Sequence, residues 1–165
     1  MKQNMSEQKN GMSVVTIDKT QTASAIIGDY LALKNALAGD DASKAASAGE
    51  SLYKAFNNFN VSSQPESQQK ELKDILKDAL ENAEHISKNG GDIEHQREHF
   101  EFLSQDVEDM IMITGADRDM YQIFCPMYNH NEGGMWLSSS KEIKNPFLGN
   151  KMSSCGTVQK EIAVK

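Results

Sequence analysis

The residues best suited to chemistry lie near the C-terminus, in the stretch from 121 to 156. Both cysteines of the 165-residue chain, three of its nine methionines and its only tryptophan fall there. Cys125 and Met127 form a Cys-Pro-Met step, and Met152 and Cys155 form a second sulfur pair three residues apart. Thiolates and thioethers select soft ions. If the loop between the two pairs closes, the four sulfur atoms could hold Cu(I) or Ag(I).

The same residues allow other interpretations. A disulfide between Cys125 and Cys155 could fasten an irregular tail with little core of its own, worth about 3–4 kcal/mol in a chain-entropy estimate. Alternatively, both cysteines are small buried hydrophobes and the methionines fill gaps. Thiolates also suit Zn(II), but thioethers do not, so the methionines favour monovalent copper over zinc. In the metal interpretation Trp136 shields the ion.

Histidines offer a second set of metal ligands. His95 and His99 stand four residues apart, which puts both on one face of a helix. If the NGGD stretch at 89–92 is a tight connection, His85 lies level with His95 across it. Such residues can chelate a metal, although a solvated or hydrogen-bonded pair is the more ordinary outcome. His99 could also join the sulfur site if the tail folds over the helices, and His130 is a further candidate ligand.

Motifs for catalysis are missing from the sequence. It contains no Gly-rich phosphate loop, no nucleophile elbow and no Cys-x-x-Cys redox spacing. It also lacks the repeated Glu-x-x-His motifs of a di-iron bundle. We therefore expect a protein that is not an enzyme.

The chain is acidic, with a formal charge of −7 and a pI near 5.1. Its lysines are dispersed among acids, which argues against nucleic acid or an anionic membrane as a partner. Arg97, for example, stands among Glu94, Glu98 and Glu101, a pattern typical of ion pairs on a solvated helix face. No apolar run is long enough to span a bilayer, so we expect a protein that is not integral to a membrane.

Four amphipathic segments must position the candidate ligands. Apolar residues recur there at three- and four-residue steps, over residues 22–39, 40–59, 66–89 and 92–114. Gly39 and Gly115 are helix terminators, the Asp40-Asp41 pair supplies one N-cap, and Asp92 supplies another. Because short loops join neighbouring helices, the sequence predicts a mainly α fold with an antiparallel four-helix bundle over residues 20–115.

The two ends of the chain differ from this pattern. Residues 1–19 are polar and predict mainly a flexible N-terminal segment, in which SVVTI at 13–17 could form a short strand. Residues 116–165 contain MYQIF and TVQKEIAV, which could form short strands that pair with each other, around an irregular loop rich in Gly, Asn and Ser. We expect this C-terminal part to pack on the bundle as a cap, within one domain.

Several stretches together resemble a domain family of undefined function from Bacteroidetes and their relatives. They are CPM at 125–127, GGMWLS at 133–138, KEIKNPFLGNKMSSCG at 141–156, YLALKNAL at 30–37 and DIEHQREHFEFLS at 92–104. That domain occurs alone in exported proteins, and at the C-terminus of periplasmic adaptor (membrane-fusion) proteins of copper/silver efflux pumps. The resemblance implies an extracytoplasmic helical domain linked to copper handling. A shorter heavy-metal motif, Tyr-x-Cys-Pro-Met-His-Pro, is also similar, but Tyr128 and Asn129 follow Met127 here.

Two functions from different classes follow. The first is an extracytoplasmic, periplasmic module whose signal peptide has been removed; it binds Cu(I), with silver or zinc less favoured, and delivers copper to efflux components. Its partner would be a metal efflux adaptor or another periplasmic protein. The alternative is a non-metal interaction domain that binds a protein or small ligand between bundle and tail, with the tail as a structural cap. The bonding of the two cysteine sulfurs distinguishes these functions.

Overall fold

The computed structural model describes residues 6–9 and 12–165, which form a mainly helical fold with a small mixed sheet. Its long helices are α1 (Ser24–Ala38), α2 (Ala42–Asn57), α3 (Glu66–Ser87) and α4 (Ile93–Thr114). Its strands are β1 (Ser6–Lys9), β2 (Met12–Ile17), β3 (Met120–Cys125), β4 (Gly134–Ser138) and β5 (Thr157–Val164). Three short elements complete it: η1 (Val61–Ser63), α5 (Tyr128–Asn131) and η2 (Gly149–Lys151).

The long helices occupy the four predicted segments, and the predicted caps bound them. The Asp41 carboxylate accepts the Lys44 N–H at 2.9 Å and begins α2. The Asp92 carboxylate accepts the His95 N–H at 3.1 Å and begins α4. Gly115 follows the end of α4 at φ 79°, in the left-handed region that favours glycine. The helix boundaries are therefore encoded locally.

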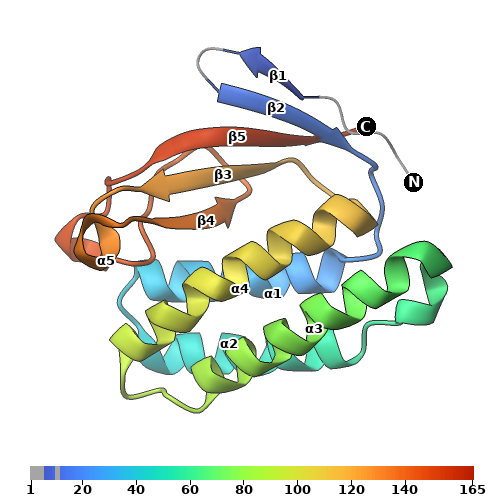
Figure 1. Ribbon diagram of the computed structural model, residues 1–165. Coiled ribbons are helices and arrows are strands. Elements are labelled where there is room, and N and C mark those ends of the chain that lie inside the picture. The colour runs from blue at the N-terminus through green and yellow to red at the C-terminus, as the bar shows by residue number, and fades with distance from the viewer. Residues whose placement is uncertain (1–5, 10–11) are drawn as a thin grey trace.

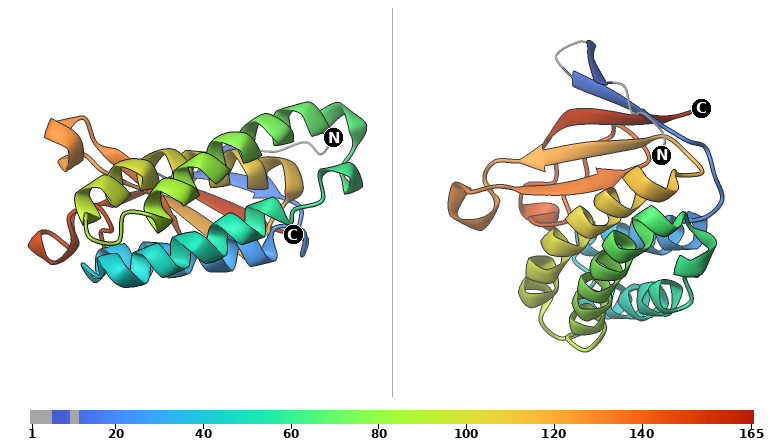
Figure 2. Two further views of the ribbon diagram at one scale, coloured as in Figure 1. Left: turned by 90° about the horizontal axis from the view of Figure 1, so that it is seen from below. Right: turned by 45° about the vertical axis from the view of Figure 1, so that its right-hand side comes forward.

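The helices and the sheet form layers (Figures 1 and 2). Helices α1 and α4 lie between the sheet and the pair α2 and α3, and β4 at the edge of the sheet contacts α4 (Figure 1). Each helix packs on the next one along the chain. The antiparallel order of a closed bundle stays a prediction. Within residues 6–9 and 12–165, none of the helices combines the length and apolar character needed to cross a membrane.

The sheet joins both ends of the chain, in the order β1-β2-β5-β3-β4. Strands β3 and β5 pair antiparallel, with Met120 opposite Ile162, which confirms the pairing predicted for MYQIF and TVQKEIAV. Strand β4 pairs with β3 on one side, and β2 runs parallel to β5 on the other. The last strand of the chain is thus the middle strand of the sheet.

The N-terminal segment differs from the flexible one predicted over residues 1–19. Strand β2 lies within it and carries the buried side chains of Met12, Val15 and Ile17. Its partner β5 is at the other end of the chain, so no local pattern indicates the pairing. Residues 1–5 and 10–11 lie outside the described residues, so the prediction for them stays untested.

Tyr30 connects α1 to both α4 and the sheet. Its hydroxyl accepts the Leu137 N–H at 2.9 Å and lies 2.6 Å from the Ser104 hydroxyl. Since Ser104 donates its own proton to the Phe100 carbonyl, Tyr30 must donate to Ser104. The Tyr30 and Phe100 rings also stack, with centroids 5.2 Å apart. The packing of the sheet on the helices therefore includes a fully satisfied buried hydroxyl network.

Arg97 fastens the tail to the helices. Contrary to the surface ion pairs predicted for it, the residue is only 3% exposed. Its Nε donates to the Pro146 carbonyl at 2.7 Å, and its Nη2 donates to the Leu37 carbonyl at 2.7 Å and to Asp40 at 2.8 Å. The hydrogen bond from Arg97 holds the pKa of Asp40 below its usual range, and a backbone bond from Asn150 adds to the effect. One guanidinium thus joins α1, α4 and the tail.

We predict that Arg97→Met lowers the free energy of unfolding by about 2–4 kcal/mol, because the buried Pro146 carbonyl loses its charged donor. Chemical denaturation measures the change. Glu94→Gln is the matched control: Glu94 contacts the same guanidinium from an exposed position, so a change within about 0.5 kcal/mol is expected. Equal effects of the two substitutions would contradict the role given to Arg97.

Candidate functional site

Three histidines meet where α3 connects to α4. His85 lies in the last turn of α3, and His95 and His99 lie in the first two turns of α4. One ligand nitrogen from each ring lies within 4.8 Å of the others. The His85 and His99 rings stack with centroids 4.3 Å apart, and the His95 ring meets that of His99 at 4.8 Å. We call this group the histidine cluster.

Local sequence explains why the cluster forms. The Gly90-Gly91 turn reverses the chain within a few residues, and the Asp92 cap starts α4 immediately afterwards. His95 and His99 then lie on the same face of α4, toward the end of α3. The meeting of His85 with His95, which the sequence predicts from a tight connection, is therefore found, and His99 completes the group.

One histidine is held by a buried amide. His99 Nδ1 lies 2.9 Å from the Oδ1 of Asn82, which stands three residues before His85 on α3. The Asn82 Nδ2 donates to the Asp78 carbonyl at 3.0 Å and to the Asp78 carboxylate at 3.1 Å. The histidine cluster is thus connected to polar groups inside the α3–α4 interface.

Asp106 lies at the far end of these polar groups. The residue is 9% exposed, and its Oδ2 has no hydrogen-bond partner among the described residues. Burial first, and then a hydrogen bond to Asp78 and the charges of Asp78 and Asp109, raise the pKa of Asp106 to about 8. At neutral pH the Asp106 carboxyl is therefore mainly protonated.

The electrostatics of the cluster favour the neutral form of His99. Partial burial lowers the pKa of His99, and the charges of His85 and His95 lower it further. Metals bind the neutral ring, so a lowered pKa leaves His99 ready to bind at neutral pH. The carboxylate of Glu98 lies 3.7 Å from His95 Nδ1.

The donor set fits a transition-metal ion. Imidazole nitrogen suits copper, zinc, nickel and iron, and three histidines with one open position form a common exchangeable site. Nitrogen atoms bound to one ion at about 2.0–2.1 Å lie about 3.3–3.6 Å from each other, so the rings need to close by at most about 1.5 Å. All three side chains are partly exposed, and His99 is held by Asn82, so the closure would come mainly from His85 and His95.

The sulfur residues do not converge in the same way. Cys125 and Cys155 form a disulfide, with Cα atoms 5.5 Å apart. Met127 and Met152 are 49% and 41% exposed. The two cysteine sulfurs are therefore bonded to each other, which is the state expected of a structural cap and not of the predicted sulfur site. A metal site at these sulfurs would first require reduction of the disulfide. Trp136 is fully buried in the core, 6.0 Å from the Phe147 ring.

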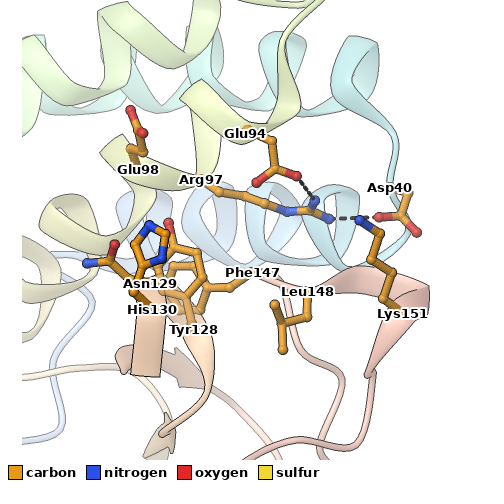
Figure 3. A pocket seen from close by; sticks show the side chains of 10 residues that line it. All are labelled: Asp40, Glu94, Arg97, Glu98, Tyr128, Asn129, His130, Phe147, Leu148 and Lys151. Atoms are coloured by element: carbon orange, nitrogen blue, oxygen red, sulfur yellow. Dashed lines mark hydrogen bonds and ion pairs between the residues drawn. The ribbon is translucent and has the colours of Figure 1, made fainter. Parts of the chain in front are cut away.

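His130 belongs to another part of the molecule. It lies on α5 and, with Tyr128, Glu98 and Arg97, lines a cavity of about 330 Å³ between the helices and the tail (Figure 3). The remaining lining residues are Asp40, Glu94, Asn129, Phe147, Leu148 and Lys151. Figure 3 shows Arg97 extending across it toward Asp40. Burial, and then the charges of nearby glutamates, raises the pKa of Tyr128 to about 12.

Sequence reasoning did not find the polar groups behind the cluster, although a signal existed. Asp78, Asn82 and His85 recur at four- and three-residue steps, and His99 and Asp106 are seven residues apart. Both patterns place the residues on single helix faces. Each alone is typical of a solvated face, and only the packing of α3 on α4 shows that the two faces meet.

We predict that Asp106→Asn makes the protein more stable and that the gain grows between about pH 4 and pH 8. An unfolded aspartate releases its proton near pH 4, whereas folded Asp106 keeps it to about pH 8. The folded state therefore binds more protons in this window, so the stability supplied by Asp106 falls as pH rises. Denaturant midpoints of both proteins at pH 5 and pH 8 measure it. A difference that is constant with pH would contradict the assignment.

A protein-family model described as "Protein of unknown function (DUF3347)" matches residues 26–119. The matched range includes the three histidines, Asn82 and Asp106, and ends before the Cys-Pro-Met step. No curated protein and no solved structure matches the chain.

Proposed function

The chain belongs to the DUF3347 family of proteins of unknown function, and we propose that it is an extracytoplasmic copper-binding module that holds the ion at the histidine cluster. The observation that carries the proposal is the convergence of three imidazole ligand atoms within 4.8 Å, at the connection of two helices. The proposal treats these helices as part of the antiparallel bundle that the sequence predicts. It gives the protein no enzymatic activity.

Copper is the favoured ion for two reasons. Among divalent first-row metals, nitrogen sites bind copper most tightly, and three ligands are also enough for Cu(I). The tail in addition resembles a domain attached to copper and silver efflux adaptors. Ag(I) would bind in the same way as Cu(I), and Zn(II) would bind with water as a fourth ligand. Because the site is partly exposed, it suits a role in which the ion is transferred to an efflux adaptor or another periplasmic protein.

The disulfide supports the proposed compartment and the cap. Disulfides persist in oxidising compartments such as the periplasm. Here Cys125 ends β3 and Cys155 precedes β5, so the bond ties the two sides of the loop that contains α5, β4 and η2. In this proposal Met127 and Met152 are accessory thioether ligands, which could receive the ion after the disulfide has been reduced.

We predict that the histidines, and not the sulfurs, determine copper affinity. Metal-free protein carrying Cys125→Ser/Cys155→Ser is titrated with Cu(I) against a competing chelator. In that background, adding His85→Ala/His99→Ala should weaken binding more than about 100-fold, beyond the 10- to 100-fold loss typical of an outer-shell partner. Adding Met127→Ala/Met152→Ala, the matched change in the tail, should weaken binding less than about threefold. Zn(II) titrations of the same variants compare the ions.

If the methionine substitutions, or the cysteine substitutions alone, weakened Cu(I) binding more than the histidine substitutions do, the metal site would be assigned to the tail. Equal, weak binding by all variants would end the metal proposal. The cysteine variant should itself lose about 3–4 kcal/mol of unfolding free energy, because the disulfide closes a loop of 30 residues.

The second candidate function is binding of a protein segment or small ligand in the cavity beside Arg97. Its support is the 330 Å³ volume between helices and tail, together with the disulfide that fastens the tail there. This is the groove that the alternative interpretation of the sequence requires. This function would be favoured if no variant bound Cu(I) tightly and if loss of the disulfide strongly lowered the free energy of unfolding.

A further inference from the structure

Asn82 is a polar side chain in an apolar interface. It is 6% exposed and lies on the face of α3 that meets α4, between Ala79 and Ala83, which are fully buried. A buried amide must satisfy its donors and acceptors to remain there. The partners it uses therefore determine how it is oriented.

The orientation of Asn82 has only one consistent solution. Its Nδ2 faces two oxygens of Asp78, the carbonyl at 3.0 Å and the carboxylate at 3.1 Å. A rotated amide would put its oxygen against both of these acceptors. Its Oδ1 must then face His99 Nδ1, at 2.9 Å. An amide oxygen has lone pairs only, so the hydrogen of this bond lies on His99 Nδ1.

This bond determines the tautomer of His99. A neutral imidazole carries one hydrogen, and here it is on Nδ1. The Nε2 atom therefore has a free lone pair before any metal arrives. The opposite tautomer would present an N–H to the ion and would first have to exchange its proton. Histidine ligands of metals are held in this manner by outer-shell acceptors.

Asp78 is an exposed residue that also contacts α4. A hydrogen bond between its carboxyl group and the buried Asp106 helps to raise the pKa of Asp106. Asp106 stands seven residues from His99 on α4, and Asp78 stands four residues from Asn82 on α3. The chain of contacts therefore returns to α4, the helix on which it begins. Movement of Asn82 away from His99 would break bonds on both helices.

We propose that Asn82, anchored by Asp78 and Asp106, is the positioning residue of the histidine cluster and fixes His99 as an Nε2 ligand. This rests on the proposed function, because it assigns the ligand atom of the same site. It goes beyond that function by naming the protein groups that prepare the site in the absence of metal.

The test begins with metal-free protein. Long-range ¹H–¹⁵N NMR spectra report which nitrogen of each histidine carries the hydrogen. Wild type should show His99 as the Nδ1–H tautomer at pH 7.5. Asn82→Ala should turn His99 into a mixture containing the Nε2–H form, and should weaken Cu(I) binding by about 10- to 100-fold. Gln105→Ala, which removes an exposed amide from α4, should change neither.

The wild-type tautomer is read without any substitution, so damage to the interface in Asn82→Ala cannot account for it. In the spectra of Asn82→Ala, the signals of His130 on α5 should stay unchanged, because that residue lies away from the α3–α4 interface. An Nε2–H tautomer in wild type, or unchanged affinity in Asn82→Ala, would overturn the assignment. If the tautomers behave as expected but His85→Ala/His99→Ala leaves copper binding unchanged, the proposed function fails instead.

Discussion

The burial of one guanidinium constrains most of this structure. Arg97 brings five N–H donors into a place that is nearly closed to water, so several acceptors must surround it. They come from α1, from Asp40 after it and from Pro146 in the tail. Position 97 faces nearly opposite to positions 95 and 99 on a helix with 3.6 residues per turn. The contact that turns Arg97 toward the tail therefore also turns His95 and His99 toward α3.

The α3–α4 interface contains a connected series of polar groups. It runs from the histidines near the end of the hairpin to the buried Asn82, the exposed Asp78 and the buried Asp106. Charge near the surface is minimised by the lowered pKa of His99, and charge in the interior by the raised pKa of Asp106. Both shifts favour neutral forms in a region of low dielectric.

Much of the helical part could be predicted from the sequence, since its information is local. Apolar steps of three and four residues indicate α1 to α4, and Asp41 and Asp92 mark two starts. The histidine cluster could be predicted in outline, because its spacing depends on one helix and one short turn. The β2–β5 pairing, the burial of Arg97 and the Asn82 bond depend on segments that are far apart or on which helix faces meet. No single stretch of sequence contains those facts, and Arg97 among its glutamates resembles a surface residue.

The position of β5 in the sheet has a consequence for how the chain folds. In the described sheet, β5 lies between the pair β1 and β2 and the pair β3 and β4, and it follows all four of these strands in the sequence. The helices can pack during synthesis because their contacts are mainly between neighbours. The sheet cannot, since its central strand pairs in parallel with a strand from the opposite end of the chain. Closing that long loop is the slow step in such topologies. The sheet can therefore be completed only after β5 has been made, whereas the four long helices, β3 and β4 all precede β5 in the sequence.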